Sequence, residues 1–216
     1  MKKVIVGCGI ALAVVAGLII LFCCGGRDGK IHTLTAWGIE CKGKEKVGDF
    51  WVYDCPTPNI HPGKNGVKAI VLHHTATANT RSSLRIMTGP KPEGKVSCHV
   101  LIDKDGSRYV LASPDKITWH AGRSMLRGRK DCNRFTVGIE FQGNTLEEPL
   151  TEAQIQSAID YCLPIMKKYH LSLSDIVTHQ QIRDEYLKAF PKSKTPTKPD
   201  ITKEEYIRFK EELSRR

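Results

Sequence analysis

The sequence predicts an α/β domain in which a mixed central β-sheet is flanked by helices. Three observations support this fold class. First, the segments 67–72, 135–141 and 176–178 are apolar and rich in β-branched residues, which is typical of buried strands. Second, Lys104-Asp105-Gly106 separates two further strand-like segments, and Asp-Gly is a strong hairpin signal. Third, the apolar period changes to that of an amphipathic helix after residue 151.

Residues 1–26 differ from the rest of the chain and predict an N-terminal membrane helix. Lys2 and Lys3 precede an almost unbroken apolar run from Val4 to Cys24. This run is longer than the roughly 7–15 residues of a cleaved signal peptide's core, and it matches the roughly 20 residues that span a bilayer. Because positive charges stay on the cytoplasmic side, we expect the following domain to face the periplasm or the outside, at the cell envelope.

A lipid anchor is the alternative for the same segment. Leu21-Phe22-Cys23-Cys24 resembles a lipoprotein processing site, with Cys24 as the lipidated residue. Both alternatives hold the domain on a membrane, and the sequence leaves the choice open. Residues 27–63 are predicted to be a linker and lead-in, and residues 64–216 to be the single functional domain.

The predicted elements of this domain follow one another without an internal repeat. In chain order they are a strand at 67–72 that ends at His73 and His74, a helix at 80–87, strands at 97–103, 107–112 and 135–141, a helix after Thr151, a strand at 176–178 and a helix after Thr202. Thr151 with Gln154, and Thr202 with Glu205, match the capping box that begins helices. Pro164 predicts a kink or local irregularity in the first of these two helices.

Eight cysteines occur in the chain, and three of them belong to the N-terminal segment. The other five are Cys41, Cys55, Cys98, Cys132 and Cys162. Cys41 and Cys55 flank a short segment and are candidates for a disulfide in an exported domain, which the sequence does not decide. No CxxC pair occurs, so a zinc-finger type of structural site is not expected.

The formal charge of +10 favours an anionic partner. Nucleic acid, an acidic lipid surface and the anionic bacterial wall all satisfy that condition. The basic residues do not combine with aromatic residues in any nucleic-acid-binding module, so we expect no nucleic acid partner. The sequence carries no information on the oligomeric state.

Five polar residues occupy positions where a polar side chain is costly to bury unless it has a partner or a function. His73 and His179 each follow a predicted buried strand, and Glu140 lies within one. Lys198 and Asp200 close the loop before the last helix. Because burial of unpaired charge is expensive, we expect these side chains to share one site. Two histidines and a carboxylate would make a three-ligand zinc site with a fourth position open to water.

Several segments together resemble the type 2 N-acetylmuramoyl-L-alanine amidases, a family that includes the animal peptidoglycan recognition proteins. The resemblance covers about residues 67–215, and its motifs occur in the family's order. They are Val-Leu-His-His-Thr-Ala-Thr-Ala at 71–78, Ser-Cys-His-Val-Leu-Ile at 97–102 followed by Asp105-Gly106, Thr-Trp-His-Ala-Gly at 118–122, Asp-Cys-Asn-Arg-Phe-Thr-Val-Gly-Ile-Glu at 131–140, Thr178-His179, and Lys198-Pro199-Asp200.

The resemblance implies a set of roles for the five polar residues. His73, His179 and Asp200 would bind Zn²⁺, Glu140 would act as the acid and base, and Lys198 would stabilise the developing oxyanion. The implied activity is hydrolysis of the amide between N-acetylmuramic acid and L-alanine, in peptidoglycan or in muropeptides. The alternative is a peptidoglycan-binding module without catalysis, because members of the family that lose the metal ligands become receptors.

Two choices concern the metal ligands. Successive residues of a strand face opposite sides, so only one of His73 and His74 can point at the metal, and the family pattern selects His73. In compact family members the distal histidine and the Lys-x-Asp element lie close together, whereas residues 180–197 separate them here. Asp184, nearer His179, is therefore kept as the alternative to Asp200.

Three further residues are candidates for substrate binding. Trp119 and His120 would line the cleft for the sugar or the peptide, or would pack in the core. Asn133 would contact substrate or cap a turn. Asp131 stands where some family members have a basic residue, so the sequence does not predict a preference for anhydro-sugar fragments.

Overall fold

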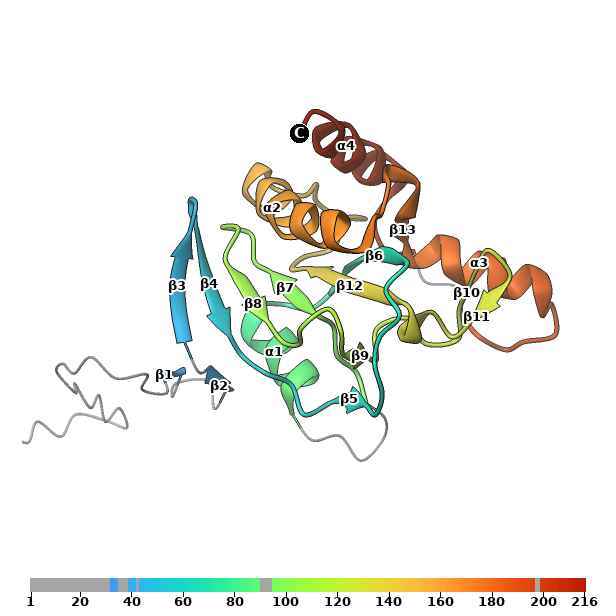
Figure 1. The fold of residues 1–216 in the computed structure, drawn as a ribbon, viewed down its shortest axis with the longest axis horizontal. Coiled ribbons are helices and arrows are strands. Elements are labelled where there is room, and N and C mark those ends of the chain that lie inside the picture. The colour runs from blue at the N-terminus through green and yellow to red at the C-terminus, as the bar shows by residue number, and fades with distance from the viewer. Residues whose placement is uncertain (1–31, 35–38, 42, 90–94, 197–198) are drawn as a thin grey trace, which may run out of the picture.

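The computed structural model describes residues 32–34, 39–41, 43–89, 95–196 and 199–216. Within these residues seven strands form one central sheet, which is flanked by helices (Figure 1). In their order across the sheet the strands are β13 (Ile176–Thr178), β6 (Ala69–His74), β12 (Thr136–Phe141), β7 (Val100–Ile102), β8 (Arg108–Val110), β4 (Phe50–Asp54) and β3 (Gly43–Val47). The predicted α/β class is confirmed.

The sheet is mixed, as predicted. β13, β6, β12 and β7 run parallel to one another, and β4 runs parallel to β8. β7 and β8 are antiparallel, which confirms the hairpin predicted at Lys104-Asp105-Gly106. β3 and β4 form a second antiparallel pair at the edge. Six short strands lie outside this sheet and pair as β1 (His32–Leu34) with β2 (Ile39–Cys41), β5 (Ile60–His61) with β9 (Ile117–Thr118), and β10 (Met125–Leu126) with β11 (Arg129–Lys130).

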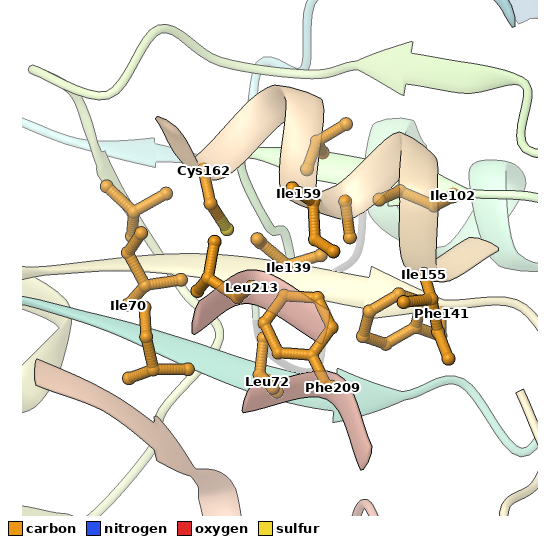
Figure 2. Close-up of a cluster of buried hydrophobic side chains, with 14 of the residues drawn as sticks. Ile70, Leu72, Ile102, Ile139, Phe141, Ile155, Ile159, Cys162, Phe209 and Leu213 are labelled. Atoms are coloured by element: carbon orange, nitrogen blue, oxygen red, sulfur yellow. The ribbon is translucent and has the colours of Figure 1, made fainter. Parts of the chain in front are cut away.

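Helices cover both faces of the sheet. α2 (Glu152–Tyr169) and α4 (Lys203–Ser214) pack on one face, where the largest apolar cluster lies. Figure 2 shows this cluster, in which side chains of the two helices meet alternate residues of the strands, among them Ile70, Leu72 and Ile139. α1 (Thr80–Thr88) packs through Leu84 on the opposite face, against Leu101. The largest apolar core thus occupies the face under α2 and α4. Polar side chains of the strands are expected on the opposite face.

The predicted capping box is complete at the start of α2 and only half formed at the start of α4. Thr151 and Gln154 form the reciprocal capping box at the start of α2, and the helix continues through Pro164. At α4 the hydroxyl of Thr202 accepts from the backbone of Glu205, but the Glu205 carboxylate accepts from the backbone N–H of Leu150 instead. This contact ties α4 to the loop before α2.

One helix, α3 (His179–Ala189), was not predicted. It occupies most of the segment that separates His179 from Asp200. Its polar sequence lacks a wide apolar stripe, which explains the omission. The sequence nevertheless contained a usable signal, because Thr178 and Gln181 form the same reciprocal capping box as Thr151 and Gln154.

The lead-in at 27–63 contributes more to the fold than a linker would. β4 pairs with β8, so residues 43–54 extend the central sheet by two strands. Cys41 and Cys55 form a disulfide, which was one of the two alternatives that the sequence left open. Cys98, Cys132 and Cys162 are buried free thiols.

The predicted membrane helix at 1–26 lies outside the described residues. Among the residues that are described, no helix combines the length and apolar character needed to cross a membrane. The anchor, whether a helix or a lipid, stays a prediction.

Candidate metal centre and active site

Parallel pairing places Glu140 beside His73. β6 and β12 are in register, with His73 opposite Glu140 and Val71 opposite Gly138. Side chains alternate along a strand, and registered residues of neighbouring strands face the same side. Ile70 and Leu72 point into the core under α2 and α4, so His73 and Glu140 point to the opposite face. Both are buried, with Glu140 only 7% exposed.

The same alternation separates His74 from this face. Its Nδ1 accepts a hydrogen bond from the Thr145 backbone N–H at 3.1 Å and lies 2.9 Å from the Thr145 hydroxyl. His73 and His74 thus contact different surroundings, as the period of a strand requires.

His179 reaches the site because β13 lies on the other side of β6. Thr178 is in register with Leu72, so the next residue along, His179, lies beside His73. His179 is also the first residue of α3, whose start is held by the Thr178 cap. The carboxyl ends of three parallel strands therefore bring two histidines and a glutamate to one edge of the sheet.

Asp200 completes a compact group of three potential ligands. Its Oδ2 lies 3.2 Å from His73 Nδ1 and 3.0 Å from His179 Nδ1, and the two Nδ1 atoms are 3.0 Å apart. All three residues are buried, and together they form a group that could hold a metal ion. Ligands arranged tetrahedrally at about 2.0–2.1 Å from zinc lie roughly 3.3–3.4 Å from one another. The donor types and spacing therefore fit a zinc site of two histidines and one carboxylate.

The alternative ligand Asp184 is not part of this group. It lies in the middle of α3 and is half-buried, whereas Asp200 is 2% exposed. Lys198 lies outside the described residues, so its predicted role stays a prediction.

A chain of hydrogen bonds holds the Nε2 side of the His73 ring, opposite the Nδ1 atom that faces His179 and Asp200. His73 Nε2 lies 3.0 Å from His120 Nδ1, and His120 Nε2 lies 3.1 Å from the Thr136 hydroxyl. That hydroxyl donates to the Cys132 carbonyl at 2.7 Å, so it accepts from His120. His120 then accepts from His73, which leaves Nδ1 of His73 without a proton and facing the metal group. When one ring nitrogen of a histidine binds a metal, a hydrogen bond from the other ring nitrogen orients the ring and sets its tautomer.

His120 and Asn133, both predicted as substrate contacts, are buried in this support. Burial lowers the pKa of His120 well below its ordinary value, and the neighbouring histidines add to the effect. The Asn133 side-chain oxygen accepts from the backbone N–H groups of His120 and Ala121 at 3.0 and 2.8 Å. Trp119 is half-buried, and its ring lies 5.1 Å from that of His61. Their contact with substrate stays a prediction.

His99 is a structural residue of the strand layer beneath the site. Its Nε2 donates to the Lys116 carbonyl at 3.0 Å, and its Nδ1 accepts from the Gly138 backbone N–H at 2.9 Å. Burial lowers the pKa of His99 to about 4, so the ring is neutral near pH 7. The neutral ring can therefore accept the hydrogen bond from Gly138.

Gly138 leaves the space that His120 occupies. A Cβ at this position would lie 2.5 Å from His120 Cγ, a distance at which something must move. We expect Gly138→Ala to lower the free energy of unfolding by about 1–3 kcal/mol, as overpacking in a core does, and to lower activity by displacing the ring behind His73. Urea denaturation and a hydrolysis assay measure the two effects.

Gly43→Ala is the matched control for that variant. Gly43 is also a strand glycine, but a Cβ there meets nothing within 4 Å. We expect its free energy of unfolding to stay within about 0.5 kcal/mol of the wild type. Equal stability and activity of Gly138→Ala and Gly43→Ala would contradict the supporting role of His120.

Comparisons with known proteins concern the family and the fold of the chain. A sequence model of the N-acetylmuramoyl-L-alanine amidase family matches residues 63–194. The 1,6-anhydro-N-acetylmuramyl-L-alanine amidase AmpD of Haemophilus influenzae is 39% identical over 89 residues, which are 41% of this chain and 48% of that protein. The N-acetylmuramoyl-L-alanine amidase AmiD of Escherichia coli is 30% identical over 131 residues, covering 54% of this chain and 46% of that protein. The chain thus spans about half the length of the curated relatives it matches.

Solved structures show the same fold. The crystal structure of a selenomethionine derivative of AmpD has a TM-score of 0.57 at 23% identity and covers 72% of this chain and 92% of that chain. The catalytic domain of XlyA has a TM-score of 0.52 at 22% identity, and it also covers 72% of this chain and 92% of that chain. At these identities the likeness concerns the fold alone.

Proposed function

Because the chain belongs to the N-acetylmuramoyl-L-alanine amidase family, we propose that it is a zinc-dependent amidase that hydrolyses the bond between N-acetylmuramic acid and L-alanine. The observation that carries the proposal is the buried group of His73, His179 and Asp200, with Glu140 in register beside His73. The substrate is peptidoglycan or its muropeptide fragments, in keeping with the names of the matched relatives.

Each residue of the site has a distinct task in this proposal. His73, His179 and Asp200 would hold the ion, which when bound lowers the pKa of a coordinated water to ~7 and polarises the carbonyl. Glu140 takes the proton of the attacking water and returns it to the departing nitrogen of L-alanine. The His120–Thr136 chain keeps His73 in the tautomer whose Nδ1 carries no proton and would bind the ion.

The cellular setting of this activity is also a proposal. It rests on the sequence of residues 1–26, which would place the domain at the cell envelope, beside its substrate.

Product analysis tests the proposed reaction. The full chain would be stripped of metal and incubated with purified peptidoglycan and with an anhydro-muropeptide, before and after zinc is restored. We expect zinc-dependent release of stem peptides with free L-alanine amino termini, which mass spectrometry detects together with lactyl-bearing glycan. Binding to peptidoglycan without release from either substrate would favour the non-catalytic recognition module.

A further inference from the structure

A pocket of about 450 Å³ lies at the amino ends of the parallel strands, and we call it the amino-end pocket. Three of the residues that line it, Lys68, Phe135 and Asp175, directly precede β6, β12 and β13. The metal-binding group lies at the carboxyl ends of the same strands. His73 follows Lys68 by five positions, which is roughly 16 Å along an extended strand. The amino-end pocket is therefore a separate place on the molecule, and the proposed hydrolysis makes no use of it.

The amino-end pocket carries an excess of positive charge. Lys68, Arg127 and Arg129 line it, and Asp175 is the one carboxylate among its described lining residues. Asp175 is already engaged, because one carboxylate oxygen accepts from the Arg127 guanidinium at 2.7 Å and the other from the Ser172 backbone N–H at 2.8 Å. The charges of Lys68 and Arg129 are therefore not balanced within the pocket. Two uncompensated cations in one concave place favour an anionic ligand.

The hairpin of β10 and β11, which carries both arginines, is fixed at its tip. Its turn residues Arg127 and Gly128 have φ angles of 52° and 78°, as a two-residue turn with positive φ at both positions requires. Their backbone N–H groups donate to the Glu185 carboxylate of α3 at 2.9 and 2.6 Å. Asparagine, aspartate or glycine is typical at the first turn position, and local rules of this kind are expected to be broken at functional or strained sites. The hairpin thus holds Arg129 in a defined place.

Arg129 is the cation best placed to receive an anion. Its guanidinium lies 4.3 Å from the centre of the Phe135 ring, and Phe135 is only 2% exposed, so the ring is a firm support. A guanidinium stacked on an aromatic ring keeps its N–H donors available at its edge. Among the described residues no carboxylate or carbonyl accepts a hydrogen bond from this guanidinium. Lys68 is exposed and likewise has no ion pair within the described part of the chain.

The remaining walls of the amino-end pocket are apolar and aromatic. Leu126, Tyr169 and Leu171 line it, and each is partly exposed. The Lys168 ammonium lies 5.1 Å from the centre of the Tyr169 ring and adds positive charge at the rim. A small anion alone would fill only part of the pocket, whereas a volume of this size suits a small organic ligand. The walls therefore indicate a ligand with an anionic head and an organic body.

We propose that the amino-end pocket binds a phosphomonoester, with the phosphate at Arg129 and Lys68 and the organic part against Leu126 and Leu171. A phosphomonoester carries close to two negative charges at pH 7 and three strong acceptor oxygens, so it balances both cations. A carboxylate has one charge and would leave one of them unbalanced. A soluble phosphomonoester and a lipid with a phosphomonoester head group share this chemistry. The site does not depend on the amidase proposal, because it uses other residues at the other end of the strands.

Titration calorimetry of the full chain with glycerol 3-phosphate and with glycerol tests the site. We expect saturable binding of glycerol 3-phosphate and no binding of glycerol. The titration is repeated with a chelator present, because a metal ion at His73, His179 and Asp200 would itself bind phosphate, and the affinity should stay within about three-fold. Absence of binding, or binding that the chelator removes, would overturn the proposal.

Variants assign the binding to the amino-end pocket. Arg129→Gln and Lys68→Gln should each weaken it roughly 10- to 100-fold, as expected for the loss of a charge-assisted hydrogen bond. Lys130→Gln is the matched control for Arg129→Gln, since Lys130 is the next residue of β11 and its ammonium lies 4.2 Å from the centre of the Phe190 ring instead. Lys64→Gln is the control for Lys68→Gln, because Lys64 is exposed outside the pocket lining. Equal weakening by all four variants would indicate diffuse attraction and overturn the proposal.

Vesicles identify the source of the phosphate. The wild type and Arg129→Gln are sedimented with phosphatidylcholine vesicles that contain or lack phosphatidic acid, whose head group is a phosphomonoester. Extra binding to phosphatidic acid that Arg129→Gln loses would assign the pocket to a lipid head group. Binding of glycerol 3-phosphate without such an effect would assign it to a soluble phosphomonoester.

Discussion

Replacing Glu140 with glutamine is expected to lower kcat by roughly 10²- to 10⁴-fold, the contribution typical of a general acid and base. Glutamine has nearly the same size and can occupy the same buried position on β12, but it cannot accept a proton from the attacking water. Glu140 lies beside His73 without being one of the three grouped ligands, so zinc content and fold should be retained. Initial rates of stem-peptide release and metal analysis of the purified variant measure these outcomes.

An exposed glutamate provides the control for this substitution. Glu148 pairs with Lys104 at 2.6 Å, with about half of its side chain exposed, and Glu148→Gln should retain wild-type activity. If Glu140→Gln hydrolyses peptidoglycan as fast as the wild type, Glu140 is not the base. If it loses zinc together with activity, Glu140 belongs to the metal-binding group instead.

Replacing Asp200 with asparagine is expected to lower zinc affinity by at least about 100-fold and to abolish activity with it. Loss of a residue that merely supports a metal ligand typically costs 10- to 100-fold in affinity, so loss of a ligand itself should cost at least as much. Asparagine keeps the shape of the side chain but removes the charge that would face the ion beside His73 and His179. Competition with a chromophoric chelator gives the affinity.

Asp184→Asn is the matched control, because both aspartates lie on the segment that follows His179 and only Asp200 joins the group. We expect this variant to bind zinc and to hydrolyse substrate like the wild type. A second readout is thermal unfolding, in which added zinc should raise the Tm of the wild type and of Asp184→Asn but not that of Asp200→Asn. Tight zinc binding by Asp200→Asn together with its loss in Asp184→Asn would assign the third ligand to Asp184.

The segment between His179 and Asp200 contains a complete helix, α3. α3 begins at the metal-binding group, projects beside β10 and β11, and is followed by the return to Asp200 (Figure 1).

Local patterns in the sequence determined the central strands and the expectation that His73 and His74 face opposite sides of the sheet. Side chains alternate along a strand with a period of two residues, so neighbouring residues such as His73 and His74 are separated without knowledge of distant contacts. The same holds for Thr151 with Gln154, which mark the start of α2 within four residues. The motif that marked Glu140 is likewise local, because it covers ten consecutive residues that end in β12.

Only the tertiary structure decided which distant residues meet. The members of the metal-binding group are separated by 106, 127 and 21 positions along the chain, and strand order rather than local pattern brings them together. The disulfide between Cys41 and Cys55 and the pairing of β4 with β8 were decided in the same way. Contacts of this kind depend on how whole elements pack, and the energy that selects the packing is spread over the core rather than held by any single motif.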